Sequence, residues 1–437
     1  MSKTIFFKKA TRIEGNANIH LQIDKGRVTA AHFMVPDFRG FEAFTKGKRV
    51  EFIPSIVCRI CGLCSCSHFI ASLKAIEDAL SIPVPSSVQA LREIILLSEW
   101  ISSHSLSAFF LSLPDAFGAQ GGVFELMRSH PEMAQTAMFL RNSGQKMASL
   151  LAKSASHPVA MTVGGFYRAP VKEEVQEVRT IAGQVKGKVA QILPQLEGMG
   201  VQATKQPLFI PEDQQANFLT TRSGNGKHRE ELRVYDASGE LRHCFAPEAL
   251  EDEIDEMTVR WSFAKFPYLS SEGFPKGIVL VGPLARAFQK SGALHHPDLQ
   301  QLPAVMELKK RQAKDLPFFD MLRFLEIYWA ADRIERLARR ADLPEKRRKA
   351  DLSGSGKGIG VVEAPRGVLV HNYLVHQGCI ESMHLLVATQ FNNALINLLI
   401  RDLADKYVNG DGLDPEGEKE ISRCIRLFDP CISCATH

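Results

Sequence analysis

The chain has 437 residues, with 53 lysines and arginines against 49 aspartates and glutamates, so its formal net charge is +4. This surplus is too small for a typical nucleic-acid-binding protein, whose basic residues are numerous and clustered. Hydrophobic residues make up 45% and charged residues 23%, a balance that excludes intrinsic disorder. No apolar run approaches the roughly 18 to 20 residues of a membrane span, and the N-terminus shows no secretory signal.

Hydrophobic periodicity predicts a mainly α protein with small antiparallel β-sheets. Near the N-terminus, Ile19–Ile23 alternates between apolar and polar residues, Asp24–Gly26 is a turn, and Val28–Phe33 returns, which is the pattern of a β-hairpin. Helical spacing follows over 68–80.

A second long helical pattern runs from Ser87 towards Leu113, where Pro114 is expected to stop the helix. Further helical patterns cover 122–155, 172–196, 303–343 and 381–407. The sequence therefore predicts a fold built mainly from long helices.

Two segments have less regular patterns. Residues 217–256 are polar, charged and rich in turn residues, so we expect a surface insertion with short strands. Residues 350–360 are expected to form a flexible approach to a strand-like stretch, 360–374. No internal repeat or clean linker divides the chain, and we expect a single interleaved domain over 1–437.

The nine cysteines are unevenly distributed, and only Cys244 and Cys379 are isolated. The others form two groups, Cys58, Cys61, Cys64 and Cys66 in the first and Cys424, Cys431 and Cys434 in the second. An odd total in a long chain without a secretory signal argues against a disulfide framework. Tight C-x-x-C pairs in a reducing compartment indicate metal or redox chemistry instead.

Two C-x-x-C turns, at 61–64 and 431–434, could together complete a four-sulfur metal site. Cys58-x-x-Cys61 is another possible pair. Structural zinc, a redox-active or catalytic metal, and a thiol–disulfide pair all remain open on spacing alone. Zinc-ribbon pairs usually lie about 15 to 20 residues apart, whereas these pairs lie near opposite ends of the chain.

Five motifs together resemble the large subunit of [NiFe]-hydrogenases. They are R-I-E-G at 12–15, R-G-F-E at 39–42, R-x-C-G-x-C-x-x-x-H at 59–68, E-A-P-R-G at 363–367 and D-P-C-x-x-C-x-x-H at 429–437. They occur in the family's order and span nearly the whole chain. The resemblance implies the family's fold, a long central helix bundle with the N- and C-termini meeting at a metal site.

The resemblance also implies a nickel–iron centre with four cysteine ligands, Cys61, Cys64, Cys431 and Cys434. All four sulfurs would bind nickel, and Cys64 and Cys434 would also bridge to an iron that carries carbon monoxide and cyanide ligands. Soft thiolates suit both metals. Cys58 and Cys66 lie outside the family pattern, and we expect them to be inert small apolar residues or oxidation-sensitive neighbours of the site.

In the family, hydrogen is split heterolytically into hydride and proton at this centre. The resemblance implies that a terminal thiolate or the Arg366 guanidine takes the first proton, and both stay open because arginine normally remains protonated while a metal-bound thiolate is a weak base. Asp115 and Asp429 resemble the carboxylates that hold Arg366, which we expect on an apolar strand. The Thr389 hydroxyl is expected to donate to a cyanide.

Two further motif residues have implied roles beside the sulfurs. Glu14 matches the family's proton-relay glutamate, and its alternative is an exposed carboxylate at a strand edge. His68 would place its ring beside a bridging sulfur as a hydrogen-bond donor, and its alternative is an ordinary core histidine.

A magnesium ion or similar hard cation is implied near the C-terminus, held by Glu42, the carbonyl of Leu385 and His437. In the family a maturation protease removes a short tail after this histidine. The chain therefore resembles the processed form, or the product of a gene that lacks the tail.

The remaining cysteines are too few for an iron–sulfur relay, and no nucleotide-binding glycine motif stands in a strand–helix context. Electrons must therefore leave through a separate iron–sulfur small subunit. The chain resembles the cytoplasmic classes, which pass electrons through further subunits to NAD(P), a deazaflavin or a heterodisulfide reductase. We expect the catalytic subunit of a cytoplasmic [NiFe]-hydrogenase; the alternatives are a non-catalytic relative of the fold and a zinc-stabilised scaffold subunit.

Overall fold

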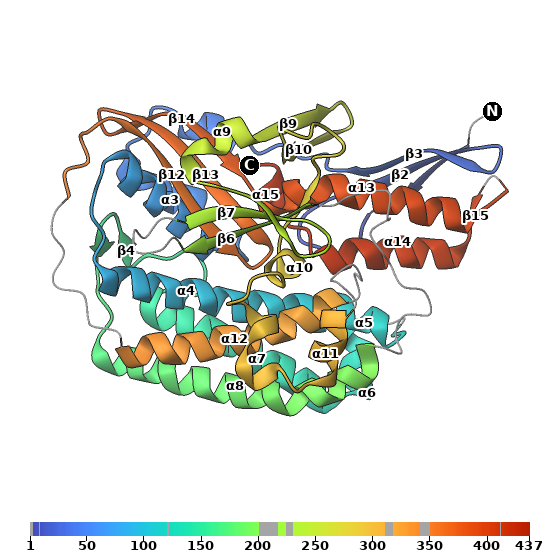
Figure 1. Ribbon diagram of the computed structural model, residues 1–437, viewed down its shortest axis with the longest axis horizontal. Helices are drawn as coiled ribbons and strands as arrows, with labels where there is room; N and C mark the ends of the chain where they lie inside the picture. The colour runs from blue at the N-terminus through green and yellow to red at the C-terminus, as the bar shows by residue number, and fades with distance from the viewer. Residues whose placement is uncertain are drawn as a thin grey trace.

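The computed structural model describes residues 3–7, 9–119, 122–200, 217–223, 230–310, 318–340, 350–410 and 412–437. Four long helices form one half of the molecule, the lower half in the view of Figure 1, and small sheets with the remaining helices form the other. The predicted fold class, mainly α with small antiparallel sheets, is confirmed.

Four long helices pack side by side as a bundle (Figure 1). They are α4 (Ser86–Ser105), α7 (Pro131–Ala152), α8 (Lys172–Gly200) and α12 (Phe318–Arg340). α4 is buried along most of its length because α7 and α12 both pack against it. The helical patterns predicted at 122–155 and 303–343 are each divided, since α6 (Val123–Ser129) precedes α7 and α11 (Pro303–Lys310) precedes α12.

The expectation that Pro114 stops the second helix is wrong. After α4, a π-helical segment, η2 (Leu106–Ser112), leads into α5 (Leu113–Ala116), and Pro114 lies in the first turn of α5. A first-turn N–H has no partner within its own helix, so proline costs no hydrogen bond there.

The same run of helix is more apolar than the sequence analysis recognised. Ser86–Asp115 is long and apolar enough to cross a membrane by length and composition, but 72% of its apolar window is buried inside the protein. A helix covered on several sides by other helices is apolar for that reason, as a core helix is.

The predicted N-terminal hairpin is confirmed as β2 (Asn18–Asp24) paired with β3 (Arg27–Met34). β1 (Lys3–Phe7) extends the sheet along the other edge of β2. Ile19, Leu21 and Ile23 are buried on one face, and α13 (Ala388–Tyr407) packs against β3. This sheet lies at one end of the molecule, away from the mark of the C-terminus (Figure 1).

A second three-stranded sheet is built from β12 (Gly356–Ala364), β13 (Gly367–His376) and β14 (Cys379–Leu386). The helical pattern predicted from 381 is therefore wrong over its first residues. β14 pairs with β13, as in the partners Leu385 and His371, and the helix α13 begins only at Ala388. The long-range pairing of two strands overrides a local helical spacing.

Helix α3 (Ser65–Ala79) lies directly on this sheet, and glycines permit the close approach. Residues two apart in a strand lie on the same face, and residues four apart in a helix also lie on one face. The β12 set Gly356, Gly358 and Gly360 therefore meets the α3 set Ala71, Ala75 and Ala79. The segment expected to be a flexible approach thus becomes a strand from Gly356 onwards, in which glycine provides space rather than flexibility.

A third sheet has the order β11 (Val279–Leu280), β6 (Asn217–Ser223), β7 (Glu230–Tyr235) and β8 (Leu241–Phe245). Leu219 and Leu232 from this sheet and Val361 and Val368 from β12 and β13 belong to one buried cluster. The 217–256 segment, expected at the surface, therefore contributes buried strands, because its few apolar residues face the neighbouring sheet. That it is an insertion stays a prediction.

Short elements complete the described chain. They are α1 (Phe41–Thr45), η1 (Val50–Phe52), α2 (Ile53–Val57), β4 (Met161–Thr162), β5 (Gly165–Phe166), η3 (Pro247–Ala249), α9 (Leu250–Glu253), β9 (Ile254–Val259), β10 (Ser262–Leu269), α10 (Pro283–Arg286), η4 (Ala293–His295), η5 (Pro297–Leu299), β15 (Val408–Asn409), β16 (Gly412–Leu413), α14 (Pro415–Phe428) and α15 (Ile432–Ala435).

We predict that Gly360→Ala destabilises the protein. The new Cβ would meet the backbone of α3, including Ala75 N at 2.6 Å, and overpacking of this kind lowers the free energy of unfolding by about 1–3 kcal/mol. Gly187→Ala on α8 is the matched control, because its Cβ would meet no atom within 4 Å and alanine favours helix. Urea unfolding of both variants checks this, and equal stability of the two would contradict the close packing.

Candidate metal centre

Four cysteine sulfurs from the two C-x-x-C segments converge in the core. Cys61 and Cys64 lie in the loop before α3, while Cys431 and Cys434 lie at the start of α15 and within it. The four sulfur atoms lie within 4.8 Å of one another, and no residue of the set is more than 4% exposed. Cys431 Sγ is 3.2 Å from Cys61 Sγ and 2.8 Å from Cys434 Sγ, well beyond the roughly 2.05 Å of a disulfide bond. The four are free thiols, and Cys58 lies outside the set.

The electrostatics of this cluster fit a metal centre. Burial raises the pKa values of Cys431 and Cys434 well above that of an ordinary thiol. Metal ligands must be thiolates, so four of them can be charged here only together with cations. The buried guanidinium of Arg366 supplies one positive charge, which Asp429 already offsets. The donor set therefore suits soft metal ions that carry several positive charges.

The R-I-E-G segment lies beside the second cysteine pair. Glu14 and Cys431 form a β-bridge, and the Ile432 N–H donates to the Glu14 carbonyl at 3.1 Å. Gly15 allows this approach, since a Cβ there would be 2.6 Å from that of Ile432. The Glu14 carboxylate lies 3.2 Å from Cys431 Sγ and accepts from the backbone N–H and hydroxyl of Ser433 at 3.0 and 2.6 Å. Glu14 is half-buried, so it connects the sulfur to the surface.

Arg366 stands over the other side of the cluster. It lies in the tight turn between β12 and β13, and not on a strand as expected. Its guanidinium donates to Cys64 Sγ at 3.2 Å, to the Asp429 carbonyl at 2.7 Å, to the Asp429 carboxylate at 3.1 Å and to the Ser103 hydroxyl at 3.3 Å. Burial lowers the pKa of Arg366, but Asp429 and the neighbouring sulfurs more than offset this and raise it well above the ordinary value.

The turn that carries Arg366 is held by a buried ion-pair network. Arg286 donates to the carbonyls of Ala364 and Pro365 at 3.1 and 2.8 Å and pairs with Glu326 and Glu363. Gly282 brings a second segment against the turn, where any Cβ would lie 2.6 Å from the Arg366 carbonyl. The contacts of Arg286 and Gly282 with the turn thus fix the backbone from which the Arg366 guanidinium extends.

Asp115 does not hold Arg366, contrary to expectation. Its carboxylate forms ion pairs with Arg12 and with Arg426, the latter at 2.6 Å. Ser103, from α4, supplies a side-chain oxygen contact to Arg366 in addition to that of Asp429. The helix beyond Pro114 carries Asp115 away from the turn and towards the R-I-E-G segment.

His68 and Thr389 both lie against the second cysteine pair. His68 Nε2 is 3.5 Å from Cys434 Sγ, and its Nδ1 is 3.0 Å from His371 Nε2. The Thr389 hydroxyl accepts from the Cys431 N–H at 2.9 Å, which leaves its own proton free for another acceptor.

The three residues of the expected hard-cation site also meet. The Leu385 N–H donates to the Glu42 carboxylate at 2.8 Å, and His437 Nε2 lies 3.4 Å from that carboxylate. His437 Nδ1 also bonds the Cys434 carbonyl at 2.8 Å. Burial raises the pKa of Glu42, but the hydrogen bond and charge of His437 outweigh it, and the pKa is lowered.

Comparison with known proteins shows a family relationship, and the matched segments include the residues of this site. A family described as nickel-dependent hydrogenase matches residues 39–116 and 242–437, and one described as HoxL-like matches 4–38. The chain is 31% identical to the alpha subunit of sulfhydrogenase 2 from Pyrococcus furiosus, over 98% of this chain and 97% of that one. The chain belongs to the nickel-dependent hydrogenase family. It is a large, catalytic subunit of that family, whose members are oxidoreductases that act on hydrogen.

Other hydrogenases support the relationship. A subunit of the F420-non-reducing hydrogenase vhu from Methanocaldococcus jannaschii is 30% identical over 92% of this chain and 98% of its own. The crystal structure of an NAD+-reducing [NiFe]-hydrogenase in the H2-reduced state superposes with a TM-score of 0.88 and 27% identity, over 100% of this chain and 99% of that one. The hydrogenase fold expected from the motifs is thereby confirmed.

Sequence reasoning missed a buried carboxylate beside this hydrogenase site. Glu99 of α4 accepts from the backbone N–H groups of Cys66 and Ser67 at 2.7 and 3.1 Å, and so binds the first turn of α3 directly after Cys64. Burial raises the pKa of Glu99 to about 7, against the effect of these hydrogen bonds. No motif marked Glu99, because its role depends on the packing of α4 against α3.

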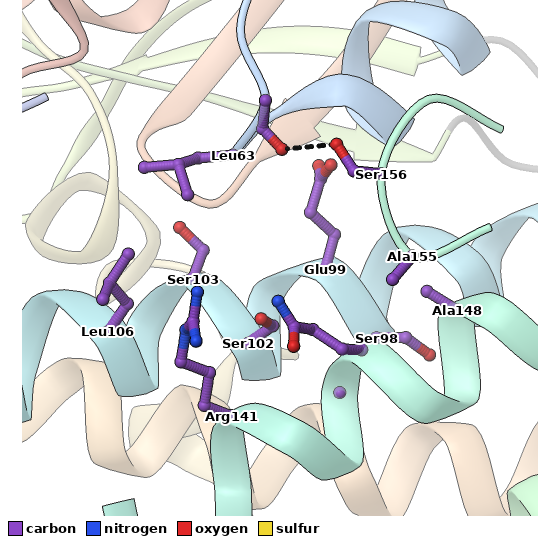
Figure 2. Close-up of a pocket in the computed structure, with 13 residues that line it drawn as sticks. Leu63, Ser98, Glu99, Ser102, Ser103, Leu106, Arg141, Ala148, Ala155 and Ser156 are labelled. Atoms are coloured by element: carbon purple, nitrogen blue, oxygen red, sulfur yellow. Dashed lines mark hydrogen bonds between the residues drawn. The ribbon is translucent and has the colours of Figure 1, made fainter. Parts of the chain in front are cut away.

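A small polar cavity lies between Glu99 and the Arg366 partner Ser103. Figure 2 shows the Arg141 guanidinium directed towards Ser103, whose hydroxyl points to the side of Leu63, and Glu99 directed towards the loop that carries Leu63. Arg141 Nε is buried there with no hydrogen-bond partner among the described residues. The cavity is small and partly polar, so it suits water molecules and not an organic substrate.

Cys58 and Cys66 are buried near the four-sulfur set but do not join it. Burial raises the pKa of Cys58 to about 11 and that of Cys66 well above the ordinary value. Burial therefore disfavours the reactive thiolate form of both residues.

We predict that Asp429→Asn weakens the hold on Arg366 without preventing folding. Asp429 has a positive φ of 49°, which asparagine tolerates. Loss of the charged hydrogen bonds should lower the free energy of unfolding by about 1.5–3 kcal/mol. Asp402→Asn is the control, since it removes only an exposed pair with Lys406. Urea unfolding checks this, and a loss no larger than that of the control would contradict it.

Proposed function

We propose that the four-cysteine site holds a nickel–iron centre, with carbon monoxide and cyanide on the iron, and that the protein uses it for reversible heterolytic cleavage of hydrogen. Such a centre supplies an open coordination position at which hydrogen is bound and split. The observation that carries the proposal is the convergence of four buried thiols from opposite ends of a nickel-dependent hydrogenase chain.

The contacts of the sulfurs support two different kinds of ligand. Cys64 and Cys434, the proposed bridging residues, face the fixed donors Arg366 and His68. Cys431, a proposed terminal ligand with Cys61, faces a carboxylate instead. A bridging sulfur shares its charge with two metals and benefits from static donors, whereas a terminal sulfur beside a carboxylate can exchange a proton with it.

We infer that the first proton goes to Cys431 Sγ and then to Glu14, and not to Arg366. The Glu14 carboxylate is within hydrogen-bonding distance of that sulfur and is half-exposed. Arg366 is buried, and its donors are engaged by Asp429, Cys64 and Ser103. A cation held in this way can stabilise negative charge at the centre, but it is a poor proton acceptor.

Two further parts of the site remain proposals. Glu42, the Leu385 carbonyl and His437 are proposed to bind magnesium or a similar hard cation, because the Glu42 carboxylate, the Leu385 backbone and the His437 ring meet there. The ion would tie His437, and with it the second cysteine pair, to the sheet that contains Leu385. The Thr389 proton, not used in its contact with Cys431, is proposed to reach a cyanide.

Exposed aromatic residues near the site support docking of an iron–sulfur small subunit. Phe38, Phe44 and Phe263 are 66%, 58% and 57% exposed, and the rings of Phe38 and Phe263 lie 5.7 Å apart. Between the first two, the Arg39 N–H donates to the Thr436 carbonyl. An apolar surface this close to the four sulfurs suits a partner that receives electrons.

The named relatives suggest how the electrons travel onward. They include F420-non-reducing and NAD+-reducing enzymes. We propose that this chain works in the cytoplasm with further electron-acceptor subunits, for NAD(P), a deazaflavin or a heterodisulfide reductase. Removal of a C-terminal tail by a maturation protease stays a prediction.

The metal content of the purified complex tests the proposed function. We expect about one nickel per chain, about one iron per chain beyond the iron of the small subunit's clusters, and infrared bands of metal-bound carbon monoxide and cyanide. Cys434→Ser should remove both metals and the activity. Cys424→Ser is the control, because Cys424 is equally buried but lies outside the four-sulfur set. Zinc as the only metal would instead support a scaffold role and would end the hydrogenase interpretation of this site.

We further predict that Glu14→Gln blocks proton exchange and leaves the metals bound. Glutamine keeps the size and can still accept from Ser433, but it cannot carry a proton away from Cys431. Hydrogen–deuterium exchange should fall by roughly 100-fold or more, with unchanged metal content and infrared bands. Glu240→Gln at the exposed turn is the control. Exchange at the wild-type rate would remove Glu14 from the proton route.

A further inference from the structure

A chain of buried side chains continues from Cys434 into the protein. Cys434 Sγ contacts His68 Nε2 at 3.5 Å, His68 Nδ1 contacts His371 Nε2 at 3.0 Å, and His371 Nδ1 contacts the Tyr373 hydroxyl at 2.6 Å. His68 is 1% exposed, and His371 and Tyr373 are fully buried. His371 and Tyr373 belong to none of the five motifs.

The sulfur determines the direction of these hydrogen bonds. As a thiolate, Cys434 can only accept, so His68 must donate from Nε2. A neutral His68 then accepts at Nδ1, which requires His371 to donate from Nε2 and to accept at Nδ1. The remaining donor for that nitrogen is the Tyr373 hydroxyl. Each ring is thus restricted to one tautomer.

The surroundings keep both imidazoles neutral. In the described part of the chain, no carboxylate is among the hydrogen-bond partners of either ring. The positive charges of His437 and Arg39 disfavour a second proton on His68, whereas the charge of Cys61 favours it. Both rings are enclosed, with His68 1% exposed and His371 0% exposed. A second proton on either ring would face a buried, weakly polar environment.

We propose that His371 and Tyr373 are positioning residues that hold His68 as a hydrogen-bond donor to the bridging sulfur of Cys434. The inference rests on the proposed function, since it concerns the sulfur that would be shared by nickel and iron. β13 supplies both residues at alternate positions, and α3 supplies His68, so the α3–β13 contact sets the geometry. A donor to the sulfur draws electron density away from the iron.

Three variants distinguish the contributions of His371 and Tyr373 to this series of hydrogen bonds. His371→Met removes both ring nitrogens with little change in volume, His371→Gln keeps a nitrogen donor near the position of Nε2, and Tyr373→Phe removes only the hydroxyl. Tyr328→Phe is the control, because this largely buried tyrosine donates to Asp298 and takes no part in the Cys434–His68–His371–Tyr373 hydrogen bonds. The purified complex is analysed by infrared spectroscopy and metal content.

We expect the carbon monoxide and cyanide bands to move to lower wavenumber in His371→Met and by less in Tyr373→Phe. His371→Gln should stay near the wild type, and Tyr328→Phe should be unchanged. Metal retention or activity in His371→Met should fall by roughly 10- to 100-fold. Wild-type bands in both His371→Met and Tyr373→Phe would overturn the inference. If the His371 variants fail to fold, the bands of Tyr373→Phe, the mildest change, decide the outcome.

A second measurement does not depend on which metal is bound. Nitrogen NMR of histidine-labelled protein, with signals assigned through the His68→Gln and His371→Gln variants, should place the proton of each ring on Nε2. A proton on Nδ1 of His68 would overturn the inference. If the wild type holds only zinc but His68 carries its proton on Nε2, the proposed function fails while the hydrogen-bond order stands.

Discussion

The structure depends on bringing four sulfur atoms from opposite ends of the chain into one dry place. Each of these thiols is buried, and burial alone disfavours its charged form. The interior therefore tolerates four thiolates only when cations neutralise them, so the proposed metal centre would also fasten the two ends of the chain to each other. The last turn of the chain is held chiefly by Glu14, Glu42 and Thr389, each of which contacts residues of the second cysteine pair or its neighbours.

Different elements supply the groups around the sulfurs. A buried charged side chain from a neighbouring element holds each of these elements in place. Arg366 is held by a hairpin turn that Arg286 secures, and His68 follows from the first turn of α3 that Glu99 secures. Glycines allow these elements to approach closely, as at the contact between β12 and α3. A long-range arrangement of this kind explains why the fold is interleaved: no continuous stretch of chain contains the site.

The motifs allowed much of the site to be predicted from the sequence, because cysteine pairs and their neighbours have fixed spacing. The partners of those residues could not be predicted. Asp115 follows a proline and looked suited to Arg366, yet a π-helical segment carries it elsewhere and Ser103 takes the place. Gly360 looked like part of a flexible linker, since glycine permits both mobility and close packing, and only the position of α3 distinguishes them. Strand β14 was missed because its pairing partner, and not its own spacing, makes it a strand.

The two sides of the cluster differ in what they allow a proton to do. On the side of Cys431 stands a half-buried carboxylate, a group that can gain and lose a proton and has access to the surface. On the side of Cys434 stand two fully enclosed imidazoles and a tyrosine, whose hydrogen bonds run in one direction and end inside the protein. The chain ends at two buried hydroxyl groups, those of Tyr373 and its neighbour Ser72, so we expect it to orient charge and not to carry protons to the surface. The asymmetry fits the proposed division of tasks, with proton transfer at one sulfur and electronic tuning at the other, although all four residues are cysteines.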